Sequence, residues 1–322
     1  MIGYGTIDKK ELTSAVSHVS AKDFQSVAAT DVSMLIQGKV PGLVVVQNSD
    51  PNGGVNSMTL RGASTLNQST EPLYVVDGIP GVNLNLISPN DIESIDVLRD
   101  ASATAIYGSK AANGVIIVTT KRGVEGPARV TYSGYVSWEK IANDHKMMTA
   151  DELRAYADEL GVEVKSDEGA STNWQKEAQR TGFAHNHNLS ISGGNKTTNY
   201  MASVNYIARE GIIRGAGNNL FTARAYVETK VLKDRLTLAA GINGNVRNEW
   251  GVSRGDYGNS VYQQMYTYTP CVPIYDENGK WFSNTSVVSQ SYNPLALINE
   301  DQSRKTLKRL QVTGKASLKI IE

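Results

Sequence analysis

This sequence of 322 residues has one cysteine, no net charge and no long apolar run. A single cysteine, Cys271, excludes an internal disulfide. The 32 basic and 32 acidic residues give no electrostatic reason to expect a nucleic-acid partner. No stretch approaches about eighteen consecutive apolar residues, so we expect no membrane-spanning helix.

The N-terminus also lacks the pattern of a secretion signal. MIGYGTIDKK has no apolar core of the kind that a signal peptide needs. We therefore expect that an N-terminal segment is missing from this sequence or has been removed.

Patterns typical of an active site or a metal site are weak throughout. His185 and His187 share one side of a possible strand, but no nearby cysteine or carboxylate completes a metal-binding set, so we expect ordinary surface histidines. Gly108-Ser109-Lys110 resembles the end of a phosphate loop without the upstream glycine that the motif requires. We expect no enzyme, no metal and no cofactor.

The remaining histidines and several acidic residues have ordinary explanations too. His18 and His145 are isolated in the sequence. Four aspartates have no basic or nucleophilic companion and suit turns and helix caps, namely Asp77, Asp91, Asp96 and Asp100.

Residues 88–123 have the pattern of a strand, a short helix and a second strand. Apolar residues alternate at 95–98, which suits a short, mostly buried strand. Residues 101–107 are good helix formers, and Gly108 is placed to end that helix in a left-handed conformation. The continuous apolar run at 115–118 is typical of a strand buried on both faces. On pattern alone, any small α/β element would fit as well.

The second half of the chain alternates between apolar and polar residues with a period of two. None of the apolar stripes carries a charge over about nine to eleven residues, the length that a tilted strand needs to cross hydrocarbon. A soluble sandwich with one wet face would show a similar alternation. The striped segments are 130–138, 189–191, 200–206, 221–227, 236–246 and 310–320.

Connection lengths favour an up-and-down barrel over a sandwich. Short turns (GGNKTT and LKDR) alternate with longer connections (139–186, EGIIRGAGNN and 249–307). Transmembrane barrels separate tight turns from longer outer loops in this way. The connection at 139–186 is predicted to be the only clearly helical part of the second half, with a capping box from Thr149 to Glu152 and an end at Gly161.

The third of these longer connections, 249–307, is rich in aromatic and amide residues. Aromatic faces and amides suit sugar rings, and they suit a rim contact with a partner lid equally well. Ordinary loop packing and a membrane-interface belt are the simpler explanations for any one of these residues. The candidates are Trp250, Tyr257, Tyr262, Tyr266 and Trp281.

Residues 88–123, SPNDIESIDVLRDASATAIYGSKAANGVIIVTTKRG, closely resemble the end of the plug domain in the SusC/RagA-like family of TonB-dependent outer-membrane transporters. The likeness is dense over 1–124 and thinner beyond it. Further matching segments follow in the family's order, namely GYGT at 3–6, LTSAVSHVSAKDF at 12–24, LIQGKVPGLVVVQNSDPNGG at 35–54, LRGASTLN at 60–67 and EPLYVVDGIP at 71–80.

The resemblance implies an α+β plug domain followed by antiparallel transmembrane β-barrel strands. We expect a TonB-dependent receptor plug domain at 1–124 and the first part of an outer-membrane β-barrel at 125–322, with about six strands and extracellular loops. Six strands cannot close around a plug, and plugged transporters use about 22 strands. The barrel is therefore expected to be incomplete and the chain to be a fragment.

The implied function is TonB-dependent import of oligosaccharides, or peptides, across the outer membrane of a Gram-negative bacterium. The implied partners are TonB, for the full-length protein, a SusD-like surface lipoprotein and outer-membrane lipid. Where the family carries a TonB-contacting segment before GYGT, this sequence has only Met1 and Ile2. The alternatives are a soluble plug-derived binding module without transport and a siderophore-type receptor.

The resemblance also suggests roles for residues of the plug. Ion pairs and loop contacts that seat the plug are expected at Arg61, Asp77, Arg99 and Asp100. Two polar loops, at 47–54 and 64–70, are expected to face the substrate through Asn48, Asp50, Asn52, Ser64, Asn67 and Gln68.

Overall fold

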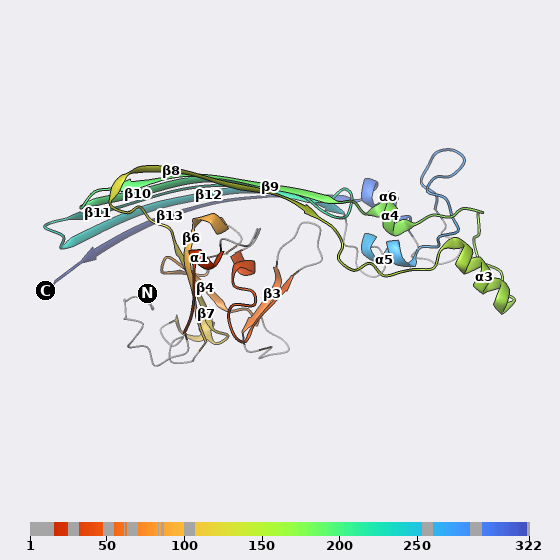
Figure 1. Cartoon of the computed structure of the whole chain (residues 1–322), viewed down its shortest axis with the longest axis horizontal. Helices are drawn as coiled ribbons and strands as arrows, with labels where there is room; N and C mark the ends of the chain where they lie inside the picture. Colours follow the sequence, from red (N-terminus) through yellow and green to blue (C-terminus); the bar gives the residue numbers. More distant parts are fainter. Residues whose placement is uncertain are drawn as a thin grey trace.

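The computed structural model describes residues 16–24, 32–47, 55–60, 62, 70–82, 84, 87–99, 107–252, 260–283 and 292–320. A long, curved sheet lies over a smaller N-terminal domain, and a group of helices extends beyond one end of the sheet (Figure 1).

The N-terminal domain is built on a five-stranded sheet with the order β1-β6-β7-β4-β5. All neighbours are antiparallel except β4 and β7, which run parallel. A separate antiparallel pair, β2 with β3, lies beside this sheet. The bounds are β1 Val16–Ser20, β2 Leu43–Gln47, β3 Val55–Leu60, β4 Leu73–Val76, β5 Ile79–Pro80, β6 Ile92–Leu98 and β7 Val115–Thr120, with short helical turns at α1 Ala21–Phe24, η2 Val32–Leu35, η4 Pro89–Asp91 and η6 Ser109–Ala111.

Strand β7 lies at the centre of this sheet and is buried on both faces, as its apolar run predicts. Ile116 and Val118 join a large cluster on one face, while Val115 and Ile117 join a smaller cluster on the other. Burial of each such side chain contributes about 1.5–3 kcal/mol, so β7 anchors the domain.

The prediction for Gly108 is wrong in its details. Gly108 has a φ of 70°, as only glycine adopts readily, but its ψ of −161° is not that of a left-handed helix end. It follows Tyr107, a residue in 3-10 helical conformation, and directly precedes the turn η6. Residues 101–106, where the helix is predicted, lie outside the described residues.

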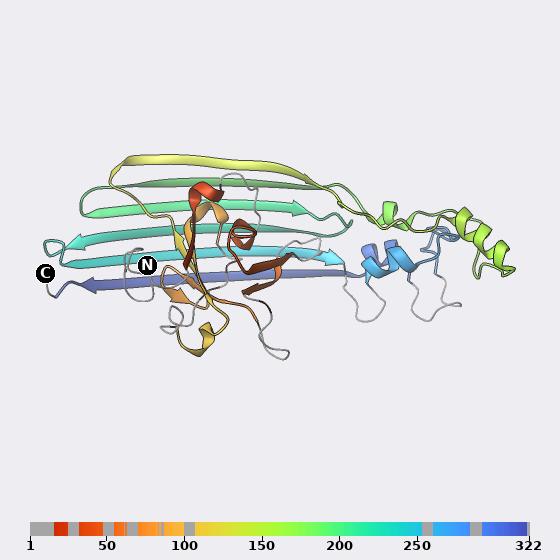
Figure 2. The same cartoon turned by 60° about the horizontal axis from the view of Figure 1, so that its bottom comes forward.

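The second half of the chain forms a six-stranded antiparallel sheet, as the stripes predict. We call this sheet the wall. Its order is β13-β12-β11-β10-β9-β8, so each strand pairs with its neighbour in the sequence (Figure 2). The bounds are β8 Gly126–Glu139, β9 Gly182–Gly194, β10 Thr198–Glu210, β11 Gly217–Val231, β12 Leu236–Val252 and β13 Gln302–Leu318. These strands are longer than the stripes that predict them.

The two faces of the wall differ in chemistry. The face turned away from the N-terminal domain exposes the apolar stripes, with Trp138 67% and Val312 71% exposed. The opposite face is polar where it meets the N-terminal domain, and Asn188 and Asn205 are buried there. Because side chains alternate along a strand, one sequence pattern produces both faces.

The chain passes from the N-terminal domain to the wall through a close contact at Gly123. A Cβ at this position would overlap the backbone of Tyr200, at the start of β10. The absence of a side chain therefore lets the link lie directly against the wall.

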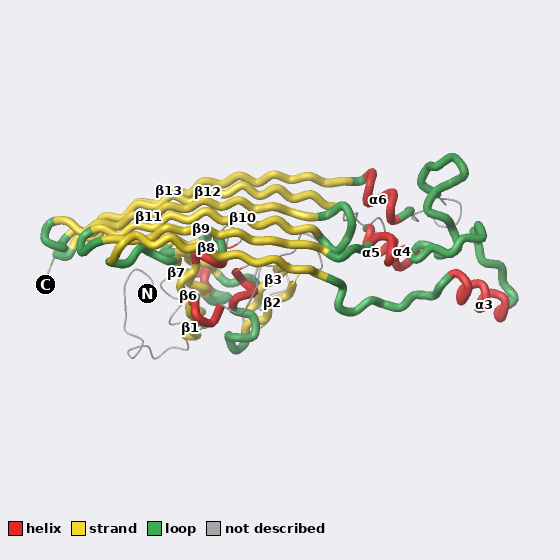
Figure 3. Tube along the Cα trace, turned by 45° about the horizontal axis from the view of Figure 1, so that its top comes forward, coloured by secondary structure: helices red, strands yellow, loops and turns green. Residues whose placement is uncertain are grey.

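Short and long connections lie at opposite ends of the wall, as predicted (Figure 3). The turns at 195–197 and 232–235 lie at one end, and the connections at 140–181, 211–216 and 253–301 lie at the other. The capping box of Thr149 and Glu152 and the left-handed end at Gly161 are both present in helix α3, Ala150–Leu160. Among the described residues, no helix has the length and apolarity needed to cross a membrane.

The prediction that only the first long connection is helical is wrong. That connection holds α3 and α4, Trp174–Ala178, but the third connection holds α5, Val261–Thr267, and α6, Pro294–Glu300. Apolar residues of α4, α5 and α6 share one buried cluster. Packing between loops therefore stabilises helices that are too short to form alone in water.

Candidate functional site between the N-terminal domain and the wall

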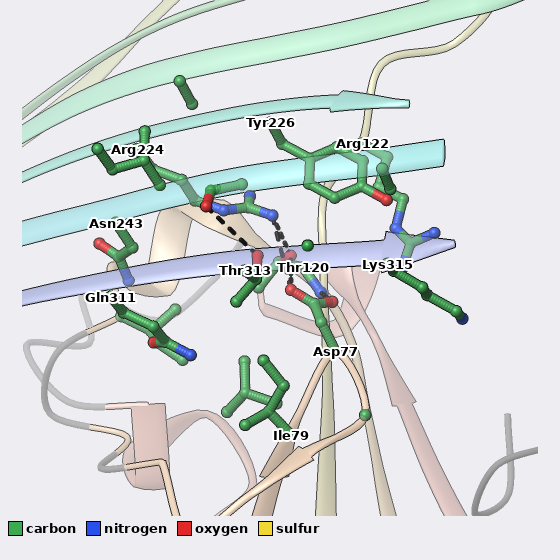
Figure 4. Close-up of a pocket in the computed structure, with 18 residues that line it drawn as sticks. Asp77, Ile79, Thr120, Arg122, Arg224, Tyr226, Asn243, Gln311, Thr313 and Lys315 are labelled. Atoms are coloured by element: carbon green, nitrogen blue, oxygen red, sulfur yellow. Dashed lines mark hydrogen bonds and ion pairs between the residues drawn. The ribbon is translucent and has the colours of Figure 1, made fainter. Parts of the chain in front are cut away.

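The contact between the N-terminal domain and the wall centres on Arg224, an inward-facing residue of β11. Its side chain is only 9% exposed and lies 3.6 Å from the Asp77 carboxylate. It also donates hydrogen bonds to the Thr120 hydroxyl (Figure 4) and, over 3.0 Å, to the carbonyl oxygen of Lys121. One wall residue thus binds two groups at the end of β7 and a third, Asp77, in the neighbouring turn between β4 and β5.

Local backbone geometry places Asp77 for this contact. Asp77 and Gly78, with φ angles of 49° and 89°, form the two-residue turn between β4 and β5. Both residues of such a turn need positive φ, which aspartate and glycine tolerate. The Asp77 carboxylate accepts hydrogen bonds from the Thr120 amide, at 3.0 Å, and from the Thr120 hydroxyl, at 2.5 Å. These hydrogen bonds within the N-terminal domain hold the Asp77 carboxylate in position for its contact with Arg224.

A second contact lies at the turn η4, which Ser88 caps as an N-cap residue. The Asn90 amide donates to Asn186 Oδ1 on β9 over 3.1 Å, and the Ser203 hydroxyl donates to Asp91 over 2.9 Å. Burial raises the pKa of the Asp91 carboxyl, while the hydrogen bond from Ser203 and the charge of Arg224 oppose that rise. Asp91 Oδ1 has no hydrogen-bond partner in the described part of the chain.

A third contact joins Arg122, just after β7, to the side of β11. Its guanidinium lies 3.3 Å from the Glu228 carboxylate and 5.2 Å from the centre of the Tyr226 ring. Tyr226 also donates to Glu228 over 2.9 Å. The ion pair and the cation–π contact fix the start of the link to the wall.

A cavity of about 340 Å³ lies beside the Arg224 contact. Its lining comes from the β4–β5 turn on one side and from β11, β12 and β13 on the other (Figure 4). The wall residues that line it lie in the half of each strand nearer the short turns.

At the opposite end of the wall, the three longer connections pack on one another. The Trp174 indole donates to the Thr269 carbonyl oxygen over 2.8 Å, and its ring meets Tyr268 edge to face. The amide of Arg180, before β9, donates to the Ile212 carbonyl oxygen in the next connection. These loops therefore form one packed unit.

The predicted plug-seating residues have different positions. Asp77 lies in the contact with Arg224. Arg99 donates instead to the Pro41 carbonyl oxygen within its own domain, over 3.1 Å, so the structure places it in an internal contact. Arg61 and Asp100 lie outside the described residues, as do all six predicted substrate-facing residues, Asn48, Asp50, Asn52, Ser64, Asn67 and Gln68.

The predicted loop aromatics also lie in different parts of the structure. Trp250 lies in strand β12, opposite Gly217, so its assignment to a loop is wrong. Tyr262 and Tyr266 lie on α5 and pack, with Trp281, against the buried loop cluster. Trp281 stacks on Tyr275 with ring centres 4.6 Å apart. Tyr257 lies outside the described residues.

Several residues described as isolated in the sequence have partners in the fold. His18 Nδ1 lies 2.6 Å from the Asp96 carboxylate, and the His145 ring packs against Tyr266. His187 Nδ1 lies 2.7 Å from the Tyr132 hydroxyl on the outer face of the wall. The expectation that the aspartates lack basic companions is therefore wrong for Asp77 and Asp96. Within the described ranges, no group of three histidine, cysteine or acidic residues is arranged to bind a metal.

Sequence reasoning missed most of this interface. No sequence motif distinguishes Asn90, Thr120, Arg122 or Arg224, and the pattern around Asp91 predicts only a turn or cap role. An arginine on the inward side of a strand, among neutral polar residues, is the one available signal for Arg224. Its partners all lie more than a hundred positions away, so the sequence pattern could not identify them.

Comparison with known proteins agrees with this architecture. Residues 8–115 match the TonB-dependent Receptor Plug Domain family. The chain is 35% identical to the TonB-dependent receptor SusC of Bacteroides thetaiotaomicron over 92% of its own length and 32% of that protein. It is 32% identical to the TonB-dependent receptor P3 of Formosa agariphila over 93% of its own length and 30% of that receptor. The N-terminal domain is thus a TonB-dependent receptor plug, and we call it the plug below.

A solved structure extends the match to the wall. The structure of the RagAB peptide importer in the open-open state superposes with a TM-score of 0.82 and 26% identity, covering 100% of this chain and 40% of that one. The chain is therefore a SusC/RagA-like TonB-dependent receptor sequence over the part that it spans, as residues 88–123 predict. It spans about a third of the length of the curated relatives it matches. TonB-dependent transporters are not enzymes.

Proposed function

We propose that the protein containing this chain imports oligosaccharides, or peptides, across the outer membrane by TonB-dependent active transport. The observation that carries this proposal is the difference in chemistry between the two faces of the wall. The inner face is polar and hydrogen-bonded to a plug, while the outer face is apolar and exposed. A wall with these faces suits hydrocarbon on one side and a wet lumen on the other.

The relatives support this assignment. They do not distinguish between the two proposed substrate classes, oligosaccharides and peptides. One relative is named the TonB-dependent receptor SusC, and a structural neighbour is titled a peptide importer. We place the protein in the outer membrane of a Gram-negative bacterium, where TonB-dependent receptors are found. A SusD-like lipoprotein and TonB are its proposed partners.

The division into a plug at 1–124 and a wall at 125–322 belongs to the same proposal. So does plug seating, now assigned to Asp77 together with Arg224. Substrate contact at the two polar plug loops remains a prediction, and so does contact of the packed outer loops with substrate or lid.

The test is deletion of the complete gene in its own bacterium, followed by growth on defined oligosaccharides and on defined peptides as carbon source. A defect on an oligosaccharide, restored by the intact gene, supports glycan import, and a defect confined to peptides assigns the peptide class. A defect seen only under iron limitation would assign a siderophore receptor instead. Normal growth throughout, with a protein that is extracted without detergent, would replace transport by a soluble binding module.

A further inference from the structure

Six inward-facing side chains lie in register across the whole wall. Pairing between neighbouring strands aligns one residue from each strand at the same level. Every one of them can form hydrogen bonds. In strand order they are Thr131, Ser190, Ser203, Arg224, Asn243 and Gln311, and we call them the polar row.

The plug uses one part of the polar row and leaves another part open. Ser203 donates to Asp91, and Arg224 binds the Thr120 and Asp77 groups. Asn243 and Gln311, the next two members, form no hydrogen bond or ion pair with the plug in the described part of the chain, and both line the cavity of about 340 Å³. The polar row therefore continues past Arg224, the last member that bonds to the plug, with two further hydrogen-bonding side chains.

The cavity combines this polar wall with an apolar surface on the plug. Val76, Ile79 and Ile87 line its plug side. In the view of Figure 4, the amide of Gln311 points from β13 toward the space above Ile79. A ligand here would meet hydrogen-bonding groups on one side and hydrocarbon on the other.

The charged groups of the cavity are largely neutralised by pairing. Asp77 pairs with Arg224, and Arg122 pairs with Glu228. Lys315, which is exposed, is the lining cation without an ion pair among the described residues. Two ion pairs and two primary amides favour an uncharged ligand, since a charged ligand would compete with the existing ion pairs.

We propose that this cavity is a binding site for a neutral, hydroxyl-rich ligand of about the size of one sugar ring. The amides of Asn243 and Gln311 offer both donors and acceptors to hydroxyl groups, and the isoleucines face the C–H side of the ring. The site lies between plug and wall, on the half nearer the short turns, and so along the seam that a solute would follow past the plug. This inference rests on the proposed transport of oligosaccharides and assigns a transit site within it.

The test is cysteine protection in the complete receptor, purified in detergent. A reporter cysteine replaces Lys315 at the cavity in a Cys271→Ala background, and its alkylation by N-ethylmaleimide is timed. Methyl α-D-glucopyranoside is the probe. Triglycine, a peptide without hydroxyl side chains, is the contrasting ligand. We expect the sugar to slow alkylation about tenfold when its concentration is about ten times its Kd, and triglycine to have no effect.

Two controls make the result specific. A reporter at the next position, Ala316→Cys, faces the outside of the wall and should not be protected. The double change Asn243→Leu with Gln311→Leu should abolish protection of the Lys315→Cys reporter, and each single change should weaken it if the double variant does not fold. Absence of protection by the sugar overturns the site, as does equal protection of Ala316→Cys or stronger protection by triglycine. Each of these results leaves the growth test of oligosaccharide import unaffected, so the two proposals fail separately.

Discussion

The guanidinium of Arg224 on the wall and the carboxylate of Asp77 on the plug lie 3.6 Å apart, and both bind the hydroxyl of Thr120. The ion pair is partly enclosed, since the Arg224 side chain is 9% exposed and the Asp77 side chain 24% exposed. Removal of one member of a fully buried ion pair costs about 3–5 kcal/mol, and the cost here is smaller because Asp77 is partly exposed and keeps its hydrogen bonds from Thr120.

Arg224→Ala is therefore expected to loosen the plug in the complete receptor. The measurement is the rate of limited proteolysis within the plug, together with the melting temperature. Arg309→Ala, an exposed inward arginine on β13, is the matched control and should change neither. Equal effects of the two substitutions would show that Arg224 contributes no more than a surface charge.

Asp91 gives a prediction with a defined pH dependence. Burial raises its pKa above the ordinary value of 3.8. A group whose pKa is raised on folding adds stability below its unfolded pKa and loses it as the pH rises through the folded value. The charged Asp91 therefore weakens the plug contact near neutral pH.

Asp91→Asn removes this charge and keeps an oxygen that can accept from Ser203. We expect the variant to gain melting temperature relative to the natural protein as the pH is raised from about 4 to 7.5. Ser203→Ala, which removes the hydrogen bond and retains the carboxyl, is the control and should show no such gain. A constant difference between Asp91→Asn and the natural protein at every pH would contradict the prediction.

The sequence predicts the strands far better than it predicts the contact between plug and wall. Alternation in β8, such as Val130 and Tyr132 against Thr131 and Ser133, is a local property that directly assigns two faces. The contact of Ser203 with Asp91 joins residues 112 positions apart, and no local pattern encodes such a partner. The loop helices α5 and α6 were missed for the same reason, because packing against α4 stabilises them.

The two faces of β8 predict opposite effects for neighbouring substitutions. Tyr132 is 63% exposed on the outer face, whereas Ser133 points inward. An arginine on the lipid face near the middle of the membrane costs about 2–4 kcal/mol, and one on the inner face costs little.

We therefore expect Tyr132→Arg to reduce the folded fraction of the complete receptor in lipid vesicles, and Ser133→Arg to leave it nearly unchanged. The folded fraction is measured by heat-dependent mobility on gels. Equal tolerance of both arginines would contradict a lipid-facing outer surface and favour the soluble alternative.

The outermost helix, α3, is tied to the loop that follows it by one charged contact. The Arg154 guanidinium donates two hydrogen bonds of 2.7 Å to the Asp167 carboxylate and one of 2.7 Å to the Ala170 carbonyl oxygen. The hydrogen bonds from Arg154, followed by the one from the Gly169 amide, lower the pKa of Asp167 to about 2. A lowered pKa means that this stability is present above the unfolded value of 3.8 and is lost as the pH falls through about 2.

Hydrogen exchange of residues 150–161 should therefore show that protection of α3 falls between about pH 4 and pH 2, after correction for the intrinsic exchange rate. Asp167→Asn should already lack part of this protection at pH 5. Asp151→Asn is the matched control, because Asp151 also contacts Arg154 but its side chain is 87% exposed. Glu152 at the capping box titrates in every variant, so only the difference between the two substitutions reports on Asp167. If both variants exchange alike at pH 5, the contact with Asp167 does not anchor the helix, and the packed loops alone hold it in place.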